Sequence, residues 1–264
     1  MRHGSLFSGI GGFDLAAEWM GWENVFHCEW NEFGKRVLQH YWPNAISYGD
    51  ITKTDFTKHR GTIDILTGGF PCQPFSHAGK RKSKQDSRYL WPEYLRAIQE
   101  IDPKFIVAEN VANIDGMALK QVLNDMENEG YEAIPPLEIE ASSVGAFHRR
   151  NRVWIIAIKE NAFNTNTNSL GLHRKKINFK RDFKFRHKQN CLFRSLVSKG
   201  IREGTDSTIF GPFDGLSSQL DGITLPKWRK ESIKAAGNAI VPQVAYEIFQ
   251  AIEKFDELKG ENNE

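Results

Sequence analysis

Residues 64–76 read DILTGGFPCQPFS, and the fold prediction starts from this stretch. The apolar run at 63–67 predicts a buried β-strand that ends at Gly68 and Gly69. Cys72 follows on a turn stiffened by Pro71 and Pro74. Open α/β sheets hold their reactive groups at the carboxyl ends of their strands, and a cysteine at such an end can act as a nucleophile. We therefore interpret Cys72 as a candidate nucleophile at a strand edge.

The first residues of the chain predict a ligand-binding turn. Residues 5–7 are expected to end a strand, residues 8–12 form the glycine-rich run SGIGG, and an amphipathic helix is expected at 13–20. Glycines in such a turn let the backbone approach a ligand closely, although a plain tight connection is the alternative. The turn lacks the full GxGxxG pattern and the chain has no GxxxxGK[ST] motif, so neither NAD nor ATP is favoured.

Acidic residues follow the next two predicted strands. The strand expected at 24–28 ends in Glu29, and the strand expected at 46–48 leads into Gly49 and Asp50. An acid at the tip of the second strand holds the ribose hydroxyls in dinucleotide-type folds. Three strand ends therefore offer glycine, Glu29 and Asp50, a pattern that favours an adenosine-containing ligand.

The rest of the pattern predicts an α/β protein with a doubly wound, mostly parallel sheet. We expect helices at 94–101, 117–129 and 243–255, and strands at 105–108, 134–139 and 153–158. Glu109 ends the strand after the cysteine strand and can face the same cavity. Arg150 and Arg152 precede the strand at 153–158 and are predicted to share one face of that extended run, with surface salt bridges as the alternative.

Periodicity is lost after residue 158, which predicts two domains. We expect a main domain at 1–158 plus 236–264 and a small variable module at 159–235. Between residues 173 and 202, lysines and arginines alternate with phenylalanines and are opposed by Asp182 alone. This pattern predicts a surface that binds a polyanion, and a solvated basic surface is the alternative. A second basic segment, at 80–88, follows Cys72 and is expected to form a loop.

Composition excludes several classes of protein. The chain has 264 residues, of which 40% are hydrophobic and 26% charged, as in ordinary globular proteins. No apolar run reaches the length of a membrane span and no leader peptide is recognisable. The three cysteines are far apart without CxxC spacing, which argues against disulfides and zinc and for a reducing compartment. We expect a cytoplasmic protein without a metal site.

Seven short motifs together carry a resemblance. They are FSGIGGF (7–13), CEWN (28–31), GDI (49–51), GGFPCQPFS (68–76), ENV (109–111), HRRNR (148–152) and GNAIVPQVA (237–245). In this order the chain resembles the bacterial and phage DNA (cytosine-5) methyltransferases. The resemblance covers essentially the whole chain except the variable module, and it implies a Rossmann-like, S-adenosylmethionine-dependent methyltransferase fold.

The resemblance implies a covalent reaction. Cys72 as a thiolate would add to carbon 6 of a cytosine that has left the DNA helix, which makes carbon 5 nucleophilic towards the donor methyl group. Glu109 would hydrogen-bond ring nitrogen 3 and the exocyclic amine, and Arg152 would orient the cytosine carbonyl with Arg150 beside it. The implied catalytic residues are Cys72, Glu109, Arg150 and Arg152.

The resemblance also implies the binding residues and partners. S-adenosylmethionine, with S-adenosylhomocysteine as product, would be held by Phe7, Gly9, Ile10, Gly12, Glu29, Trp30, Asp50, Ile51, Pro71, Asn238 and Ile240. Double-stranded DNA would be contacted by Ser76, Lys80, Arg81, Lys82, Arg88, Lys175, Lys176 and Arg181. No metal is implied. We expect a monomer in the cytoplasm of a bacterial or phage-infected cell, serving restriction-modification with a cognate restriction endonuclease or phage self-protection.

Two departures and three alternatives accompany this resemblance. The family usually has Gln where this chain has His148, and its usual arginine- and leucine-rich motif is not recognisable in residues 216–234. An RNA (tRNA) cytosine methyltransferase is one alternative, although its Cys-Phe-Thr tripeptide is missing. A catalytically inactive DNA-binding relative is another, and the filled catalytic positions argue against it. Exocyclic-amine methyltransferases carry a [DNS]PP[YFW] turn at this strand edge, where this chain has Gly-Phe-Pro-Cys-Gln.

Overall fold

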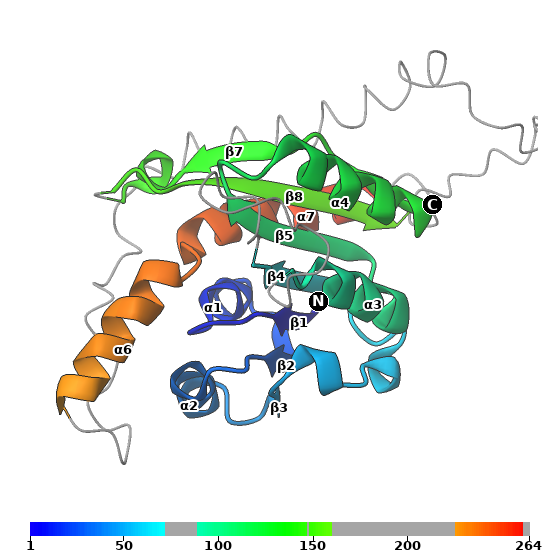
Figure 1. Cartoon of the computed structure of the whole chain (residues 1–264). Coiled ribbons are helices and arrows are strands. Elements are labelled where there is room, and N and C mark those ends of the chain that lie inside the picture. Colours follow the sequence, from blue (N-terminus) through cyan, green and yellow to red (C-terminus); the bar gives the residue numbers. More distant parts are fainter. Residues whose placement is uncertain (72–88, 147, 160–224, 261–264) are drawn as a thin grey trace, which may run out of the picture.

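The computed structural model of the chain describes residues 1–71, 89–146, 148–159 and 225–260. These residues form an eight-stranded sheet with helices on both faces (Figure 1). The strand order is β3-β2-β1-β4-β5-β8-β6, and β7 also pairs with β8. The α/β fold expected from the sequence is therefore confirmed.

Five parallel strands form the part of the sheet that carries the predicted motifs. They are β1 (Arg2–Leu6), β2 (Glu23–Cys28), β3 (Ile46–Tyr48), β4 (Ile65–Gly69) and β5 (Phe105–Val111). The order reverses between β1 and β4, where ligands bind in doubly wound folds. β4 continues through Gly68 and Gly69, the two residues at which the sequence pattern predicts its end.

The other edge of the sheet is antiparallel. β8 (Asn151–Lys159) pairs with β5 along its length. β6 (Tyr131–Ala133) pairs with the last residues of β8, and β7 (Leu137–Glu140) pairs with its first residues. The single strand expected at 134–139 is therefore wrong. Pro135 and Pro136 fall between β6 and β7, and because proline has no N–H it cannot continue the hydrogen-bonded ladder.

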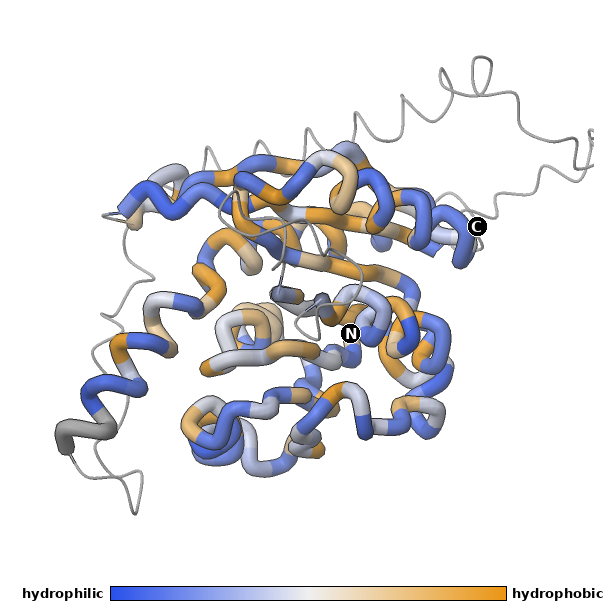
Figure 2. Tube along the Cα trace, viewed as in Figure 1, coloured by the Kyte–Doolittle hydropathy of each residue, from blue (hydrophilic) through white to orange (hydrophobic). Residues whose placement is uncertain are grey.

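Helices cover the two faces in pairs and create two cores. Alternating side chains of the central strands point to opposite faces, so Ile65, Val107 and Ile156 enter one core, and Leu66, Ile106 and Ile155 the other. The first core lies under α1 (Gly12–Trp19) and α7 (Pro242–Gly260), and the second under α3 (Trp91–Ile101) and α4 (Gly116–Asn128). The apolar stretches of the trace gather between these layers in Figure 2.

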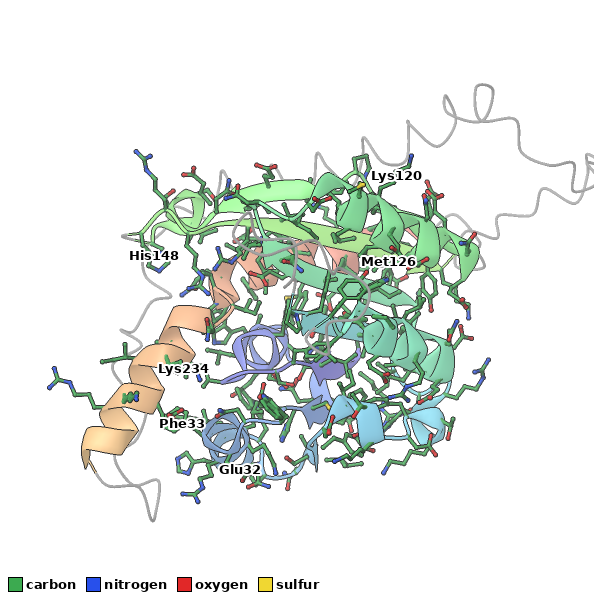
Figure 3. All side chains as sticks on the ribbon, in the orientation of Figure 1. Glu32, Phe33, Lys120, Met126, His148 and Lys234 are labelled. Carbon is green, nitrogen blue, oxygen red and sulfur yellow. The ribbon has the colours of Figure 1, made fainter. Side chains whose placement is uncertain are left out.

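Two further helices pack against each other at the glycine turn. α2 (Glu32–Tyr41) and α6 (Leu225–Asn238) contact each other through a small apolar cluster. In it, Ala235 and Ala239 pack against the buried side chains of Ile10, Phe33 and Val37. Phe33 and Lys234 in Figure 3 mark where these helices face each other. α6 was not predicted, because its charged sequence has few apolar residues to show a helical period. The division into two domains remains a prediction, since residues 160–224 lie outside the described part of the chain.

Helix boundaries otherwise follow the predictions within a few residues. α3 begins at Trp91 rather than at residue 94 and has Pro92 in its first turn, a position that proline favours. α7 extends to Gly260 rather than ending at residue 255. Short 3-10 turns occur at Ile51–Lys53, Thr57–His59 and Ala141–Val144. No helix in the described ranges combines the length and apolarity that crossing a membrane requires.

A buried polar network lies directly beneath the glycine turn. The Ser5 hydroxyl contacts both carboxyl oxygens of Asp14, at 2.9 and 3.1 Å, and lies 2.7 Å from the Ser8 hydroxyl. Asp14 is fully buried, and loss of hydration raises the pKa of its carboxyl group to about 7, against the hydrogen bond from Ser5. The network thus holds a carboxyl group that titrates near neutral pH.

We expect an Asp14→Asn variant to gain stability relative to wild type as pH rises. Because the pKa of Asp14 is raised in the folded protein, ionising its carboxyl group is unfavourable there. The free energy of unfolding of wild type therefore falls as pH rises from 3.8 towards 7, by about 4 kcal/mol in all. Asparagine cannot ionise, so the variant avoids this loss. Urea midpoints at pH 5 and pH 8 measure the effect. Asp55→Asn is the control, because Asp55 is exposed, its pKa is lowered by Thr57, and it stays ionised over this range. An equal midpoint difference at both pH values would contradict the assignment.

Candidate functional site

The glycine turn after β1 has the conformation that the motif predicts. Gly9 and Gly11 have φ angles of 60° and 85°, a region that favours glycine, and Phe7 adopts 50° at the strand exit. A Cβ atom on Gly12 would lie 2.8 Å from the backbone oxygen of Ile240. The turn therefore packs directly on the segment between α6 and α7. This contact brings together two motifs from opposite ends of the sequence.

Glu29 closes the second side of this turn. Its carboxylate accepts hydrogen bonds from the backbone N–H groups of Gly9 (2.8 Å) and Asn31 (2.7 Å), one on each oxygen. Burial raises the pKa of Glu29, and these backbone hydrogen bonds oppose the rise. Each carboxylate oxygen keeps a second lone pair that can accept from a ligand hydroxyl group. Trp30 beside it is 79% exposed and offers an aromatic face.

Asp50 and Ile51 lie at the end of β3, next to Glu29. Glu29 donates its backbone N–H to Tyr48 at 3.1 Å, and the Asp50 side chain accepts from the backbone N–H and hydroxyl groups of Thr52. These hydrogen bonds lower the pKa of Asp50. Ile51 is buried. One Asp50 oxygen therefore holds its own turn, and the other lies 3.5 Å from the exposed Lys53 ammonium group.

Glu109 and Arg152 form the ion pair of the site. Glu109 is paired in register with Trp154, so Arg152 lies one diagonal step away on the same face of the sheet, and Arg152 Nε reaches Glu109 Oε1 at 2.8 Å. Burial raises the pKa of Glu109, and the charges of Arg152 and Arg150 pull it back down. A Cβ on Gly69 would lie 3.2 Å from Glu109 Oε2, so this carboxyl group faces the end of the cysteine strand.

The sequence pattern predicts that Arg150 and Arg152 share one strand face, but Arg150 lies outside the strand. It precedes β8 and has a φ angle of 31°, so the alternation of an extended strand does not reach it. Its Nη1 instead donates to the backbone oxygen of Gly237 at 2.6 Å. Arg150 therefore ties the start of β8 to the end of α6. His148, labelled in Figure 3, is exposed two residues earlier.

Asn110 positions the backbone on the way to Cys72. Its side-chain amide donates to the backbone oxygen of Phe70 at 3.0 Å, and its carbonyl oxygen accepts from the N–H of Val111. Asn110 is 3% exposed, so these bonds are shielded from water. In the ENV motif only Glu109 was expected to have a functional role. A buried asparagine directly after a strand-edge carboxylate is the signal that indicates this contact.

The remaining predicted residues divide into two groups. Pro71 ends the described part of the β4 exit. Asn238 is the last residue of α6 and Ile240 follows the helix, with Ile240 Cδ1 3.3 Å from a Cβ built on Gly69. Cys72 and the predicted DNA contacts lie outside the described residues: Ser76, Lys80, Arg81, Lys82, Arg88, Lys175, Lys176 and Arg181. In the described ranges no cluster of His, Cys, Asp or Glu side chains could hold a metal ion.

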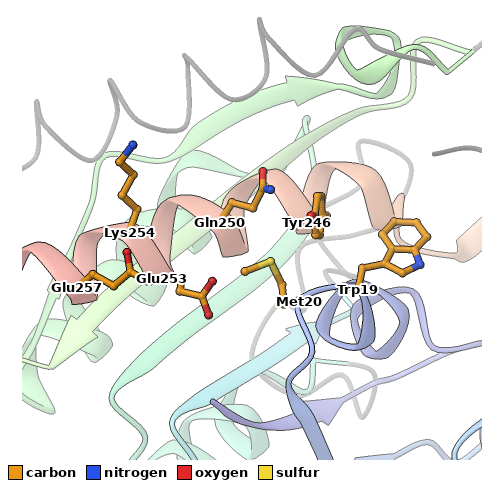
Figure 4. A pocket seen from close by; sticks show the side chains of 7 residues that line it. All are labelled: Trp19, Met20, Tyr246, Gln250, Glu253, Lys254 and Glu257. Atoms are coloured by element: carbon orange, nitrogen blue, oxygen red, sulfur yellow. The ribbon is translucent and has the colours of Figure 1, made fainter. Parts of the chain in front are cut away.

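A separate hollow lies on the covered face of the sheet, away from these residues. Figure 4 shows it between the end of α1 and α7, lined by polar and aromatic side chains: Trp19, Met20, Tyr246, Gln250, Glu253, Lys254 and Glu257. None of the predicted site residues borders it. This hollow is therefore separate from the predicted site.

Comparison with known proteins decides the family. A family profile described as C-5 cytosine-specific DNA methylase matches residues 1–208. The chain belongs to this family. It is 36% identical over 160 residues to the type II methyltransferase M.Eco47II of Escherichia coli, covering 58% of this chain and 38% of the relative. It is 34% identical over 168 residues to M.HhaI of Haemophilus parahaemolyticus, covering 60% of this chain and 49% of the relative. The chain thus spans less than half the length of these curated methylases.

Solved structures confirm the methyltransferase fold over a longer span. A prophage-encoded E. coli protein described as a DNA modification methyltransferase aligns over 97% of this chain and 99% of its own, with a TM-score of 0.64 and 20% identity. The Entamoeba histolytica methyltransferase EhMeth aligns over 98% of both chains, with a TM-score of 0.64 and 15% identity. The resemblance inferred from the motifs is therefore confirmed for both family and fold.

Proposed function

We propose that this C-5 cytosine-specific DNA methylase family member transfers a methyl group from S-adenosylmethionine to carbon 5 of a flipped-out cytosine in double-stranded DNA. The observation that carries the proposal is the ion pair between buried Glu109 and half-buried Arg152, in which the Glu109 carboxyl group faces Gly69 at the end of the cysteine strand. A carboxyl group that is buried, raised in pKa and held by a guanidinium group is suited to grip the polar edge of a pyrimidine.

The proposed reaction is covalent because carbon 5 of cytosine is a poor nucleophile. The Cys72 thiolate forms a bond to carbon 6 while Glu109 gives a proton to ring nitrogen 3, and the ring electrons become available at carbon 5. S-adenosylmethionine would supply an electrophilic methyl group to carbon 5 and leave as S-adenosylhomocysteine. A base then removes the proton from carbon 5, the bond between carbon 6 and sulfur breaks to release the Cys72 thiolate, and ring nitrogen 3 returns its proton to Glu109. Arg152 holds Glu109 and, with Arg150 beside it, orients the cytosine carbonyl.

The strand-edge residues fit this cofactor. Glu29 has an open lone pair on each carboxylate oxygen for the two ribose hydroxyls, and the exposed Trp30 ring can stack on the adenine. Asp50 and Ile51 lie on the neighbouring strand end. The residues proposed to bind the cofactor are those that the resemblance implies. Gly9 and Gly12 would let the backbone approach the cofactor, and Asn238 and Ile240 would lie on its methionine side.

Duplex DNA is the proposed substrate, and the basic segment at 173–202 supports it by its charge. Flipping a cytosine out of the duplex costs a few kcal/mol, which contacts to the flipped base and the backbone recover. We propose a monomeric, cytoplasmic enzyme that serves restriction-modification or phage self-protection. A cognate restriction endonuclease is the partner expected in the first case. An RNA cytosine methyltransferase and an inactive relative are the alternatives that the experiment must separate.

Bisulfite sequencing of DNA and RNA from cells that express the chain tests this proposal. We expect protected cytosines within one short sequence in plasmid DNA, absent from cells that carry the empty vector. The same treatment applied to transfer RNA tests the RNA alternative. Protection confined to RNA would replace the substrate, and the absence of any protected cytosine would overturn the proposed activity.

A further inference from the structure

Arg96 on α3 grips the turn that follows Asp50. Its Nη2 donates to the backbone oxygen of Ile51 at 2.6 Å, and its Nη1 donates to the backbone oxygen of Thr54 at 3.0 Å. These carbonyl groups lie at the two ends of the 3-10 turn at Ile51–Lys53. A single guanidinium group therefore sets the distance between the ends of the turn.

Carboxylates of the same helix hold Arg96 in place. Its Nε contacts Glu93 at 2.8 Å and its Nη1 contacts Glu100 at 2.6 Å, one turn on either side. Glu100 also accepts from the backbone N–H of Phe56 at 2.8 Å, so the same cluster anchors the residues after the turn. The fork of a guanidinium group can make these contacts at once, whereas an ammonium group acts as a point charge.

The turn has local hydrogen bonds between Asp50 and Thr52 and from the Thr54 N–H to the Ile51 oxygen, and Arg96 adds the contact that ties it to a separate helix. β3 is a three-residue edge strand that pairs only with β2, and residues 50–56 continue from it without strand pairing. The proposed function places the adenine of the cofactor against Asp50 and Ile51, which are the first residues of this turn. The shape of that part of the pocket therefore depends on a side chain from a different helix.

We propose that Arg96 is a positioning residue that fixes the adenine side of the cofactor pocket by bridging the carbonyls of Ile51 and Thr54. This inference rests on the proposed use of S-adenosylmethionine. Because Arg96 touches the turn and neither Glu109 nor the β4 exit, it acts on cofactor affinity and leaves the chemical step unchanged.

Arg96→Met tests the inference, with Arg96→Lys as the conservative variant and Arg60→Met as the control. Arg60 also bonds α3, through the backbone oxygens of Gln99 and Glu100, but the turn at Ile51–Lys53 is not among its contacts. We expect Arg96→Met to raise the Kd for S-adenosylhomocysteine, measured by calorimetry, roughly tenfold, as for the loss of a hydrogen bond to a charged group. Arg96→Lys should weaken binding less, and Arg60→Met should bind like wild type.

Steady-state kinetics separates positioning from a merely structural role. KM for S-adenosylmethionine should rise together with Kd in Arg96→Met. Its kcat at saturating cofactor should stay within about twofold of the wild-type value, because the lost contact stabilises the bound cofactor equally in the ground state and the transition state. An Arg96→Met variant that melts lower but binds like wild type overturns the inference. If that variant does not fold, an Arg96→Lys variant with wild-type affinity overturns it. Wild type that binds neither compound overturns the proposed function as well.

Discussion

A Cys72→Ala variant will bind S-adenosylhomocysteine with wild-type affinity and will transfer methyl groups at a rate below detection. Without the sulfur, carbon 6 receives no nucleophile and carbon 5 stays unreactive towards the methyl donor. Apart from Pro71, the proposed cofactor residues lie at the ends of β1, β2 and β3 and at the end of α6, so the substitution leaves them in place. Incorporation of labelled methyl groups into DNA measures the loss, and calorimetry measures the retained affinity.

Cys28→Ala is the matched control for this experiment. Cys28 is buried, its thiol donates to the backbone oxygen of Gly49, and burial raises its pKa to about 12, so it is not a thiolate at neutral pH. This variant should keep its methyl transfer. Target DNA that contains 5-fluorocytosine should also remain attached to the wild-type protein after denaturation and not to Cys72→Ala. Turnover by Cys72→Ala would exclude the covalent route.

A Glu109→Gln variant will slow methyl transfer by roughly 10²- to 10⁴-fold, the usual contribution of general acid–base catalysis. Glutamine fills the same space but cannot give a proton to ring nitrogen 3, and it leaves Arg152 without its counter-charge. The protonated carboxyl group is the active form, so wild-type activity should fall as pH rises through the raised pKa of Glu109. The variant should lose this dependence.

Glu138→Gln provides the control for the Glu109 experiment. Glu138 is an exposed acid on β7, which pairs with β8 as β5 does, but it faces solvent rather than the cysteine strand. Its rate and pH profile should match wild type. If Glu109→Gln kept most of the wild-type rate, Glu109 would be a structural partner of Arg152 and not the acid of the reaction.

Local patterns predicted the parallel strands and the residues at their ends. Short apolar runs that stop at Glu29, Asp50 and Glu109 could be read as strands with acids at one edge, because the carboxyl ends of parallel strands meet there. The glycine turn was predicted to let the backbone approach a ligand; in the structure Ile240 lies against Gly12, and the space beside Gly9 is open. Residue order alone was sufficient for these features, since each depends on a few neighbouring residues.

Features that depend on distant partners could not be predicted in this way. Arg150 was expected on the strand face of Arg152, but the backbone oxygen of Gly237 is its partner, in a segment far along the chain. The bridge from Arg96 to Ile51 and Thr54 has no sequence pattern, because helix periodicity describes the buried face and Arg96 lies at its margin. The sequence of α6 shows little helical periodicity, and its contacts with α2, which help to stabilise it, cannot be read from that sequence.

The contact of Gly12 with Ile240 has a consequence for how the protein is made. The β1 turn leaves the ribosome early, whereas Ile240 and α7, which cover α1, are synthesised near the end of the described chain. Contacts between distant parts of a sequence form slowly, after the local ones. A nascent chain would therefore hold an open glycine turn on a half-covered sheet until its last helix docks. The proposed cofactor pocket would be complete only after α7 and the segment that carries Ile240 have docked.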